Sequence, residues 1–195
     1  MRLLTTHAFA ALLVLTPKLT SPELLVSQPE SKLWVEGTST IKGFSCKVPE
    51  FELKVSGDAN AVTAVLSAQK AVKSVELTLA TAKIDCGNGT MNDHMREALK
   101  AEKAPTLTFK LSSYDVSKAA AGVEGTVRGS LNLGGVDKPV DVTATATDAG
   151  NGALRVVGSY ELALSTFELK APSLMFGRIK VGDKVQVKFD LVLKN

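Results

Sequence analysis

The sequence of 195 residues is poor in aromatic side chains, histidine and cysteine, and each shortage excludes a class of protein. Aromatic residues make up only 5%, and the basic residues are scattered rather than gathered in a patch interleaved with aromatics, so no binding of nucleic acid is expected. With two histidines, two cysteines and no C-x-x-C pair, the chain predicts no metal site, and we expect no cofactor. The formal net charge of +3 supports at most a transient contact with an acidic membrane surface.

The sequence also lacks the arrangements from which common active sites are built. Reactive residue types cluster only at Asp93, His94, Arg96 and Glu97, but neighbours on a helix point apart, so Asp93 cannot readily orient His94. No serine lies in a nucleophile-elbow sequence, and "GNGT" at 87–90 lacks the lysine of a phosphate-binding loop. We therefore expect no catalytic residues and no enzymatic activity.

The N-terminus has the composition of a secretory signal peptide. One positive charge is followed by an apolar run, densest over 8–15, that is too short to cross a bilayer. Because no clean cleavage site follows, we expect residues 1–26 to be a signal peptide or a disordered leader. Cys46 and Cys86 form an even pair in a chain that looks exported, which predicts a disulfide, with two buried free thiols as the alternative. These features predict a periplasmic or secreted protein.

From about residue 32 the sequence alternates between apolar and polar residues, which is typical of strands with one covered face. In "VEGTVRGSLNLGG", Val127 and Leu131 share one parity and Thr126 and Arg128 share the other. We leave the segment 59–71 unassigned, because it fits a loop, a short helix or a ragged strand. The alternation predicts about eight strands joined by short turns, near 32–41, 44–55, 72–84, 106–114, 123–133, 140–147, 154–164 and 185–193.

Short connections make neighbouring strands antiparallel, and closing the sheet removes its exposed edges. We therefore expect an all-β domain over residues 32–195, an extended antiparallel β-barrel of about eight strands. An eight-stranded barrel is either just filled by side chains or holds one small ligand. Small residues on the expected inner faces favour a cavity, although glycines also serve where strands bend or coil. These small residues are Gly125, Gly129, Ala144, Ala146, Gly158 and Ala163.

Residues 90–109 interrupt the strand pattern with a helical one. Thr90 or Asn92 fits the N-cap of a helix that Pro105 would end. We expect this one short helix to cap a mouth of the barrel, with its charged residues in water. A histidine there, His94, either binds a ligand head group or is a surface or capping residue. The apolar face of the helix consists of Met91, Met95 and Leu99.

Three segments resemble the YceI-like family of exported bacterial proteins, over about residues 34–193. "LWVEGTSTIKGFSCKV" resembles the family's first strand pair and "MNDHMREALKAEKAPTLTF" its helix and following strand. The most specific is "VRGSLNLGGVDKPVDVTATA", which resembles a family hairpin. The resemblance implies a lipocalin-like barrel whose long interior binds an amphiphile, in some members a polyisoprenoid chain. The sequence departs from the family at Glu168, where the family has glycine, and in its cysteine pair, which only part of the family has.

Together these features predict an exported binding protein that sequesters or carries an isoprenoid or other lipid amphiphile inside the barrel. The alternative is a stress-response or envelope interaction domain with a filled, non-binding barrel. The expected partner is a lipid or isoprenoid small molecule, and a homodimer is compatible with the sequence. The residues expected to contact the ligand are Trp34, Phe44, Phe51, Met95, Leu99, Phe109, Leu131, Tyr160, Phe167 and Phe176.

Overall fold

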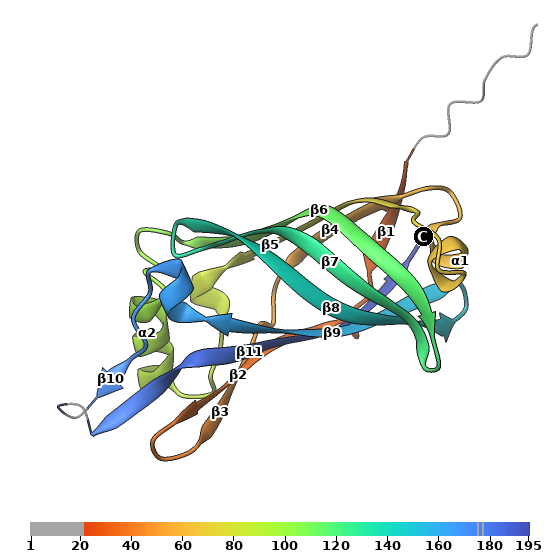
Figure 1. Cartoon of the computed structure of the whole chain (residues 1–195). Helices are drawn as coiled ribbons and strands as arrows, with labels where there is room; N and C mark the ends of the chain where they lie inside the picture. Colours follow the sequence, from red (N-terminus) through yellow and green to blue (C-terminus); the bar gives the residue numbers. More distant parts are fainter. Residues whose placement is uncertain (1–21, 175, 177) are drawn as a thin grey trace, which may run out of the picture.

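The computed structural model describes residues 22–174, 176 and 178–195, and most of the predicted leader lies outside them. Within these residues the chain forms eleven strands, two α-helices and two short 3-10 helices (Figure 1). The strands are β1 (Glu23–Ser27), β2 (Lys32–Ser39), β3 (Gly43–Lys47), β4 (Glu52–Gly57), β5 (Val72–Ala80), β6 (Thr106–Ala119), β7 (Gly122–Leu133), β8 (Val136–Gly150), β9 (Ala153–Ala163), β10 (Ser173–Leu174) and β11 (Ile179–Lys194). The helices are α1 (Ala61–Leu66), η1 (Thr81–Lys83), α2 (Gly89–Ala98) and η2 (Leu164–Phe167).

Eight strands close into an antiparallel barrel, which confirms the predicted fold class. Their order is β1-β4-β5-β6-β7-β8-β9-β11, and β11 returns to β1 through the pairs Val26↔Lys194 and Ser27↔Leu193. β6, β7, β8 and β9 follow one another as long strands with tight turns, and the chain passes through η2 and β10 before it enters β11 (Figure 1). The period-2 alternation is therefore preserved over most of the wall, with one apolar face turned inward.

The barrel begins earlier than the sequence predicted. β1 was placed in the leader or the linker after it, yet it pairs with β4 and β11 and completes the wall. Leu25 is only 3% exposed, whereas Leu24 and Val26 on either side of it face outward. This short strand alternates like the others, but its apolar outward residues made it look like a continuation of the leader.

Three of the predicted strands also have other bounds. The strand predicted over 44–55 is two strands, β3 and β4, because the chain breaks around Pro49, which has no N–H to donate to a neighbouring strand. The strand predicted over 106–114 continues to Ala119, and the one predicted over 185–193 begins already at Ile179. The longer strands reach beyond the barrel wall.

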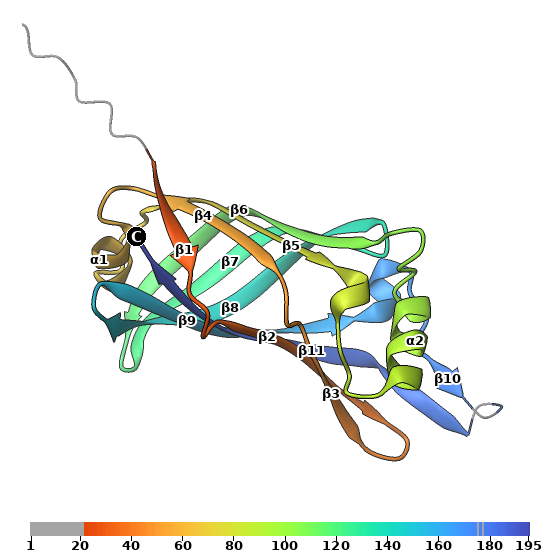
Figure 2. The same ribbon diagram turned by 180° about the vertical axis from the view of Figure 1, so that it is seen from behind.

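At one end of the barrel, β3, β2, β11 and β10 form a four-stranded extension (Figure 2). β2 pairs with the first part of β11, whereas β1 pairs with its last two residues. The predicted disulfide, Cys46–Cys86, joins β3 to the segment that leads into α2. An isolated bridge between Lys47 and Asp85 lies beside it. These two links hold α2 against the barrel at this end.

The two helices cover opposite ends of the barrel (Figures 1 and 2). The unassigned segment 59–71 contains α1, so the expectation of one capping helix was incomplete. α1 buries Ala61, Val62 and Val65 in a core cluster with residues of β1, β7 and β9. α2 has no fully buried residue, and its apolar face lies half-buried on the cluster around Leu33, Leu79 and Ile84. The first cover is packed more firmly than the second.

The ends of α2 differ from the prediction. Its N-cap is Asn88, whose side chain accepts a hydrogen bond from the Met91 N–H at 3.0 Å, rather than Thr90 or Asn92. Asn92 instead accepts from the Cys86 N–H at 2.7 Å, so it anchors the loop before the helix. The α-helix ends at Ala98, and turns lead to Pro105. Asp93, His94, Arg96 and Glu97 therefore lie on a short helix that has no fully buried residue.

Three glycines, two in the barrel wall and one in β2 of the extension, lie beneath phenylalanine rings. Phe44 covers Gly37, Phe109 covers Gly129 and Phe189 covers Gly158, each from a neighbouring strand. A Cβ atom at any of these glycines would overlap the ring above it. At these three positions the small residue makes room for an aromatic ring rather than for a ligand.

We expect Gly158→Ala to destabilise the barrel by about 1–3 kcal/mol, because overpacking forces side chains and backbone to shift. The new Cβ would overlap the Phe189 ring and lie 2.5 Å from the backbone oxygen of Thr143. Chemical denaturation measures the loss. Gly89→Ala is the matched control, since no atom lies within 4 Å of its Cβ position. Equal unfolding free energies for the two variants would contradict this account.

Candidate ligand-binding cavity

An apolar cavity of about 280 Å³ lies inside the barrel. Its lining extends from Ile84 and Leu33, beneath α2, to Val65 on α1, so it follows the long axis of the barrel. Every barrel strand except β1 contributes lining residues. They come from the inward face of each strand, whose parity changes where the register shifts in β5 and β6, and most are valine, leucine or phenylalanine. The cavity is thus a product of the same alternation that defines the strands.

The middle of the cavity is open because three neighbouring strands place small residues side by side. Gly125 on β7 pairs with Ala144 on β8, and Ala144 pairs with Gly158 on β9. Phe189 covers Gly158, but Gly125, Ala144 and the nearby Ala146 line the cavity directly. Some of the small residues on the inner faces therefore leave space for a ligand, as the sequence predicted. Others, such as Gly158, are covered by a phenylalanine ring from a neighbouring strand.

Two tyrosines carry the only polar side-chain atoms among the lining residues. The Tyr114 hydroxyl accepts a hydrogen bond from the Val72 N–H at 2.9 Å. The Tyr160 hydroxyl makes no protein hydrogen bond within the described residues. Burial, and secondarily the charge of Asp141, raise the pKa of Tyr160, so its phenol stays protonated at neutral pH. Tyr160 can therefore donate a hydrogen bond to a polar group in the cavity.

Four of the predicted ligand contacts line the cavity: Phe51, Phe109, Leu131 and Tyr160. Met95 and Leu99 do not line it, but they lie half-buried on α2 and pack against the residues that form its end. They cover the cavity from outside. The predicted role of α2 as a cap is consistent with this placement.

The other four predicted contacts lie elsewhere. Trp34 points outward, because its neighbours Leu33 and Val35 on the same strand point inward. Its Nε1–H donates to Glu36 Oε1 at 2.8 Å. The Phe44 ring packs over Gly37 on the neighbouring strand and does not line the cavity. The remaining two were chosen for residue type rather than for parity on a strand. They are Phe167, fully buried in the core after β9, and Phe176, fully exposed in the turn between β10 and β11.

The candidate list missed most of the aliphatic lining, including Val35, Val142, Ala144, Val156 and Leu191. It also missed Tyr114 and Phe189. Parity identifies all of these except Tyr114, since each shares the inward face of its strand with other lining residues. Tyr114 faces inward because the register of β6 shifts between Leu111 and Ser113. Choosing aromatic residues alone discarded that signal.

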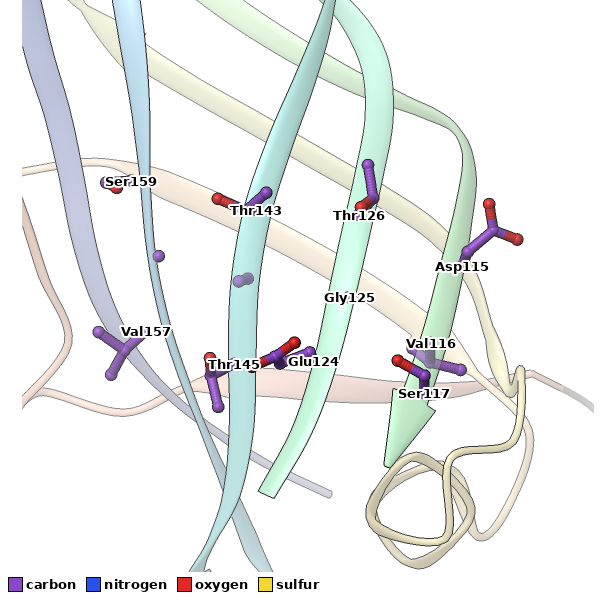
Figure 3. Close-up of a pocket in the computed structure, with 12 residues that line it drawn as sticks. Asp115, Val116, Ser117, Glu124, Gly125, Thr126, Thr143, Thr145, Val157 and Ser159 are labelled. Atoms are coloured by element: carbon purple, nitrogen blue, oxygen red, sulfur yellow. The ribbon is translucent and has the colours of Figure 1, made fainter. Parts of the chain in front are cut away.

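A second hollow, of about 470 Å³, lies on the outer face of β6 to β9 (Figure 3). Its side chains are the opposite parity of the same strands, and Thr126, Thr143 and Ser159 form a row of hydroxyls. Lys70 and Arg128, at 2.8 and 2.6 Å, hold the pKa of Asp115 at about 2. That carboxylate is already paired, and the remaining side chains of the hollow are mostly hydroxyls on the outer surface of the barrel.

The described residues hold no group of three or more His, Cys, Asp or Glu side chains that could bind a metal ion. Within the same ranges, no helix combines the length and apolar composition needed to span a membrane. His94, on the exposed helix α2, has no acidic partner within the part of the chain that the structure describes. The interior cavity is therefore the candidate site.

Comparison with known proteins places this barrel in a family. BcnA of Burkholderia cenocepacia matches with 24% identity over 84% of this chain and 96% of that chain, at a TM-score of 0.67. The YceI protein of Campylobacter jejuni matches with 18% identity over 75% and 82%, at 0.59. A polyisoprenoid-binding domain from Saccharophagus degradans, implicated in plant cell wall breakdown, matches with 12% identity over 88% and 97%, at 0.58. No curated protein sequence matches significantly. The YceI-like domain model matches residues 21–193, and the chain therefore belongs to the YceI-like family.

Proposed function

We propose that this protein is an exported binding protein that sequesters or carries an isoprenoid or other lipid amphiphile in the barrel cavity. The observation that carries the proposal is the interior cavity, lined by aliphatic and phenyl groups with two phenols as its only polar side chains. Burying a methylene group contributes about 0.8 kcal/mol, so an apolar chain needs few polar contacts to bind. A polyisoprenoid-binding domain of the same fold supports this ligand class.

The size of the cavity suggests how much of a chain it receives. Its volume of about 280 Å³ lies just below the usual range of small-molecule sites. At about 30 Å³ for each water-sized group, it has room for on the order of ten methylene-sized groups. We infer that roughly two isoprene units fit the resting barrel, and that a longer chain requires side chains or α2 to move.

The proposal of export depends on the disulfide and the leader. A disulfide that joins β3 to the segment before α2 persists in an oxidising compartment, which supports a periplasmic or secreted location. The apolar N-terminal run supports the same location. We propose binding rather than catalysis because the cavity lining offers no nucleophile–base pair.

The competing function is an interaction domain with a filled barrel, and the cavity disfavours it. Native mass spectrometry separates the two. Protein purified from its own envelope should carry a bound mass that is lost on organic extraction and regained on adding prenols. Extracted protein that takes up no prenol, quinone or fatty acid would overturn the proposal and favour the filled barrel.

We expect Tyr160→Phe to weaken binding of prenols and other polar-headed chains about tenfold, while binding of an alkane of the same length is unchanged. The Tyr160 hydroxyl, unlike that of Tyr114, forms no hydrogen bond with the described part of the protein, and a lost hydrogen bond of about 1–1.5 kcal/mol corresponds to this factor. Competition against a fluorescent chain measures both affinities.

Tyr114→Phe is the matched control, because the Tyr114 hydroxyl already bonds the backbone at Val72. It should lower the stability of the protein without changing the preference between the two ligands. If Tyr160→Phe weakened both ligands equally, the phenol would act through packing and not as a head-group donor.

A further inference from the structure

Two neighbouring turns at the α2 end of the molecule expose large apolar side chains. Ile41, between β2 and β3, is 68% exposed, and Phe176, between β10 and β11, is fully exposed. Hydrogen bonds hold the turns together, because the Thr40 N–H donates to the Lys180 carbonyl at 3.0 Å and its hydroxyl to the Arg178 carbonyl at 3.2 Å. The two apolar side chains therefore belong to one structural unit.

The charge of this unit has one sign. The segments 38–44 and 172–182 contain three basic residues and no acidic one. None of the three, Lys42, Arg178 and Lys180, forms a salt bridge within the described part of the chain. The nearest carboxylates along the strands point to other partners, since Glu36 binds Lys188 and Trp34, and Asp183 accepts from Ser165, and among the described residues neither forms a salt bridge with the three cations. The positive charge of the turns is therefore not neutralised by their own strands.

We propose that the tip surface, formed by Ile41, Lys42, Phe176, Arg178 and Lys180, binds the surface of an anionic phospholipid bilayer. Apolar side chains among uncompensated cations suit a membrane interface, where the apolar groups enter the acyl boundary and the cations meet lipid phosphates. The charge complementarity selects a membrane over an apolar protein partner.

Comparison with another exposed apolar residue supports this choice. Val157 is 42% exposed on the outer face of the barrel, but it lies among hydroxyls and Glu124 (Figure 3). That hollow also contains Val116, but no lysine or arginine is among its described lining residues. The tip surface is thus defined by exposed apolar side chains together with three cations, and not by an exposed apolar side chain alone.

The tip surface also has a defined position relative to the cavity. β10 and the β2–β3 turn lie at the end of the molecule that α2 covers, in both opposite views (Figures 1 and 2). A molecule docked through the turns brings α2 and the nearby end of the cavity toward the bilayer. The proposal goes beyond the proposed cargo, and membrane binding can be measured with vesicles that contain none.

Co-sedimentation with phosphatidylglycerol–phosphatidylethanolamine vesicles, compared with pure phosphatidylcholine vesicles, tests the proposal. At roughly fivefold for each basic residue near the surface, we expect about a hundredfold preference for the anionic vesicles at low salt. Lys42→Gln combined with Lys180→Gln should remove most of this preference. Ile41→Asn combined with Phe176→Asn should weaken binding to the anionic vesicles at least tenfold, and asparagine suits the positive φ of 55° at Phe176.

Val157→Asn is the matched control and should bind vesicles like the wild type. Because the substituted side chains are exposed, all variants should unfold at the wild-type temperature. Wild-type protein that prefers neither vesicle, or tip variants that bind as well as the wild type, would overturn the proposal. A third result would also overturn it: the wild type forms a dimer but binds no vesicles, and the tip substitutions dissociate the dimer. The tip surface would then join two copies of the chain.

Discussion

Ala144→Phe is expected to reduce the affinity for a prenol at least a hundredfold while the barrel stays folded. Ala144 points into the middle of the cavity, and its partners in register are Gly125 and Gly158. A phenyl ring adds six carbon atoms, which would occupy roughly half of a space of about 280 Å³. The ring would thus take the place of the ligand's own chain.

Thr143→Phe controls for this experiment, because Thr143 is the next residue on β8 and faces the outer hollow (Figure 3). It should bind prenol like the wild type. The Ala144 variant should lose at most about 1–3 kcal/mol of stability, the usual cost of overpacking. A folded Ala144→Phe protein that keeps wild-type affinity would show that the chain binds outside the cavity, and the proposed site would be wrong.

Removing the disulfide is expected to have the largest effect on stability. Cys46 and Cys86 are 40 residues apart, and the chain-entropy model gives about 4 kcal/mol for a loop of this length. In a domain of this size, that loss lowers the melting temperature by roughly 10 °C. Alanine is the better replacement at both positions, since Cys46 is buried in the cluster under α2.

Thermal unfolding with and without a reducing agent provides the control. The wild type should lose its extra stability in the reducing agent, and the Cys46→Ala, Cys86→Ala protein should melt at one temperature in both conditions. A wild-type melting temperature that reduction leaves unchanged would mean that packing of β3 and α2, and not the covalent link, holds this end together.

The alternation of apolar and polar residues made the barrel predictable, because each of the long strands has one solvent-exposed face and one face turned to the interior. In β7, β8 and β9 most inward residues named from the sequence line the cavity or the core, but Ala163 was assigned to the wrong face, because its neighbours Leu162 and Leu164 are the buried ones. Two short elements were not recognised. β1 is five residues long with apolar residues on both faces, and α1 has no side-chain cap and no charged residue in its terminal turns. Their structure is decided by packing, which local sequence does not report.

The candidate site was less predictable than the fold. Aromatic residues were chosen for their affinity for lipid chains, but a strand allows only alternate residues to face inward, which excludes Trp34. Phe44 and Phe189 cover glycines on adjacent strands, and only the register of those strands reveals this. Residues in turns, such as Phe176, follow no parity at all. Contacts across strands, rather than residue type, decide which rings can meet a ligand.

The unequal burial of the two end covers has a kinetic consequence. α1 is fixed by three buried residues, whereas α2 has none. The disulfide fixes the segment before α2, and the helix itself is held by the half-buried contacts of Met91, Met95 and Leu99. Elements with little buried surface open locally at a smaller free-energy cost than global unfolding requires. A bound ligand would then enter and leave through the α2 end, at a rate set by the free-energy cost of opening that helix. The wall of the barrel would determine which molecule is held, and α2 how long it stays.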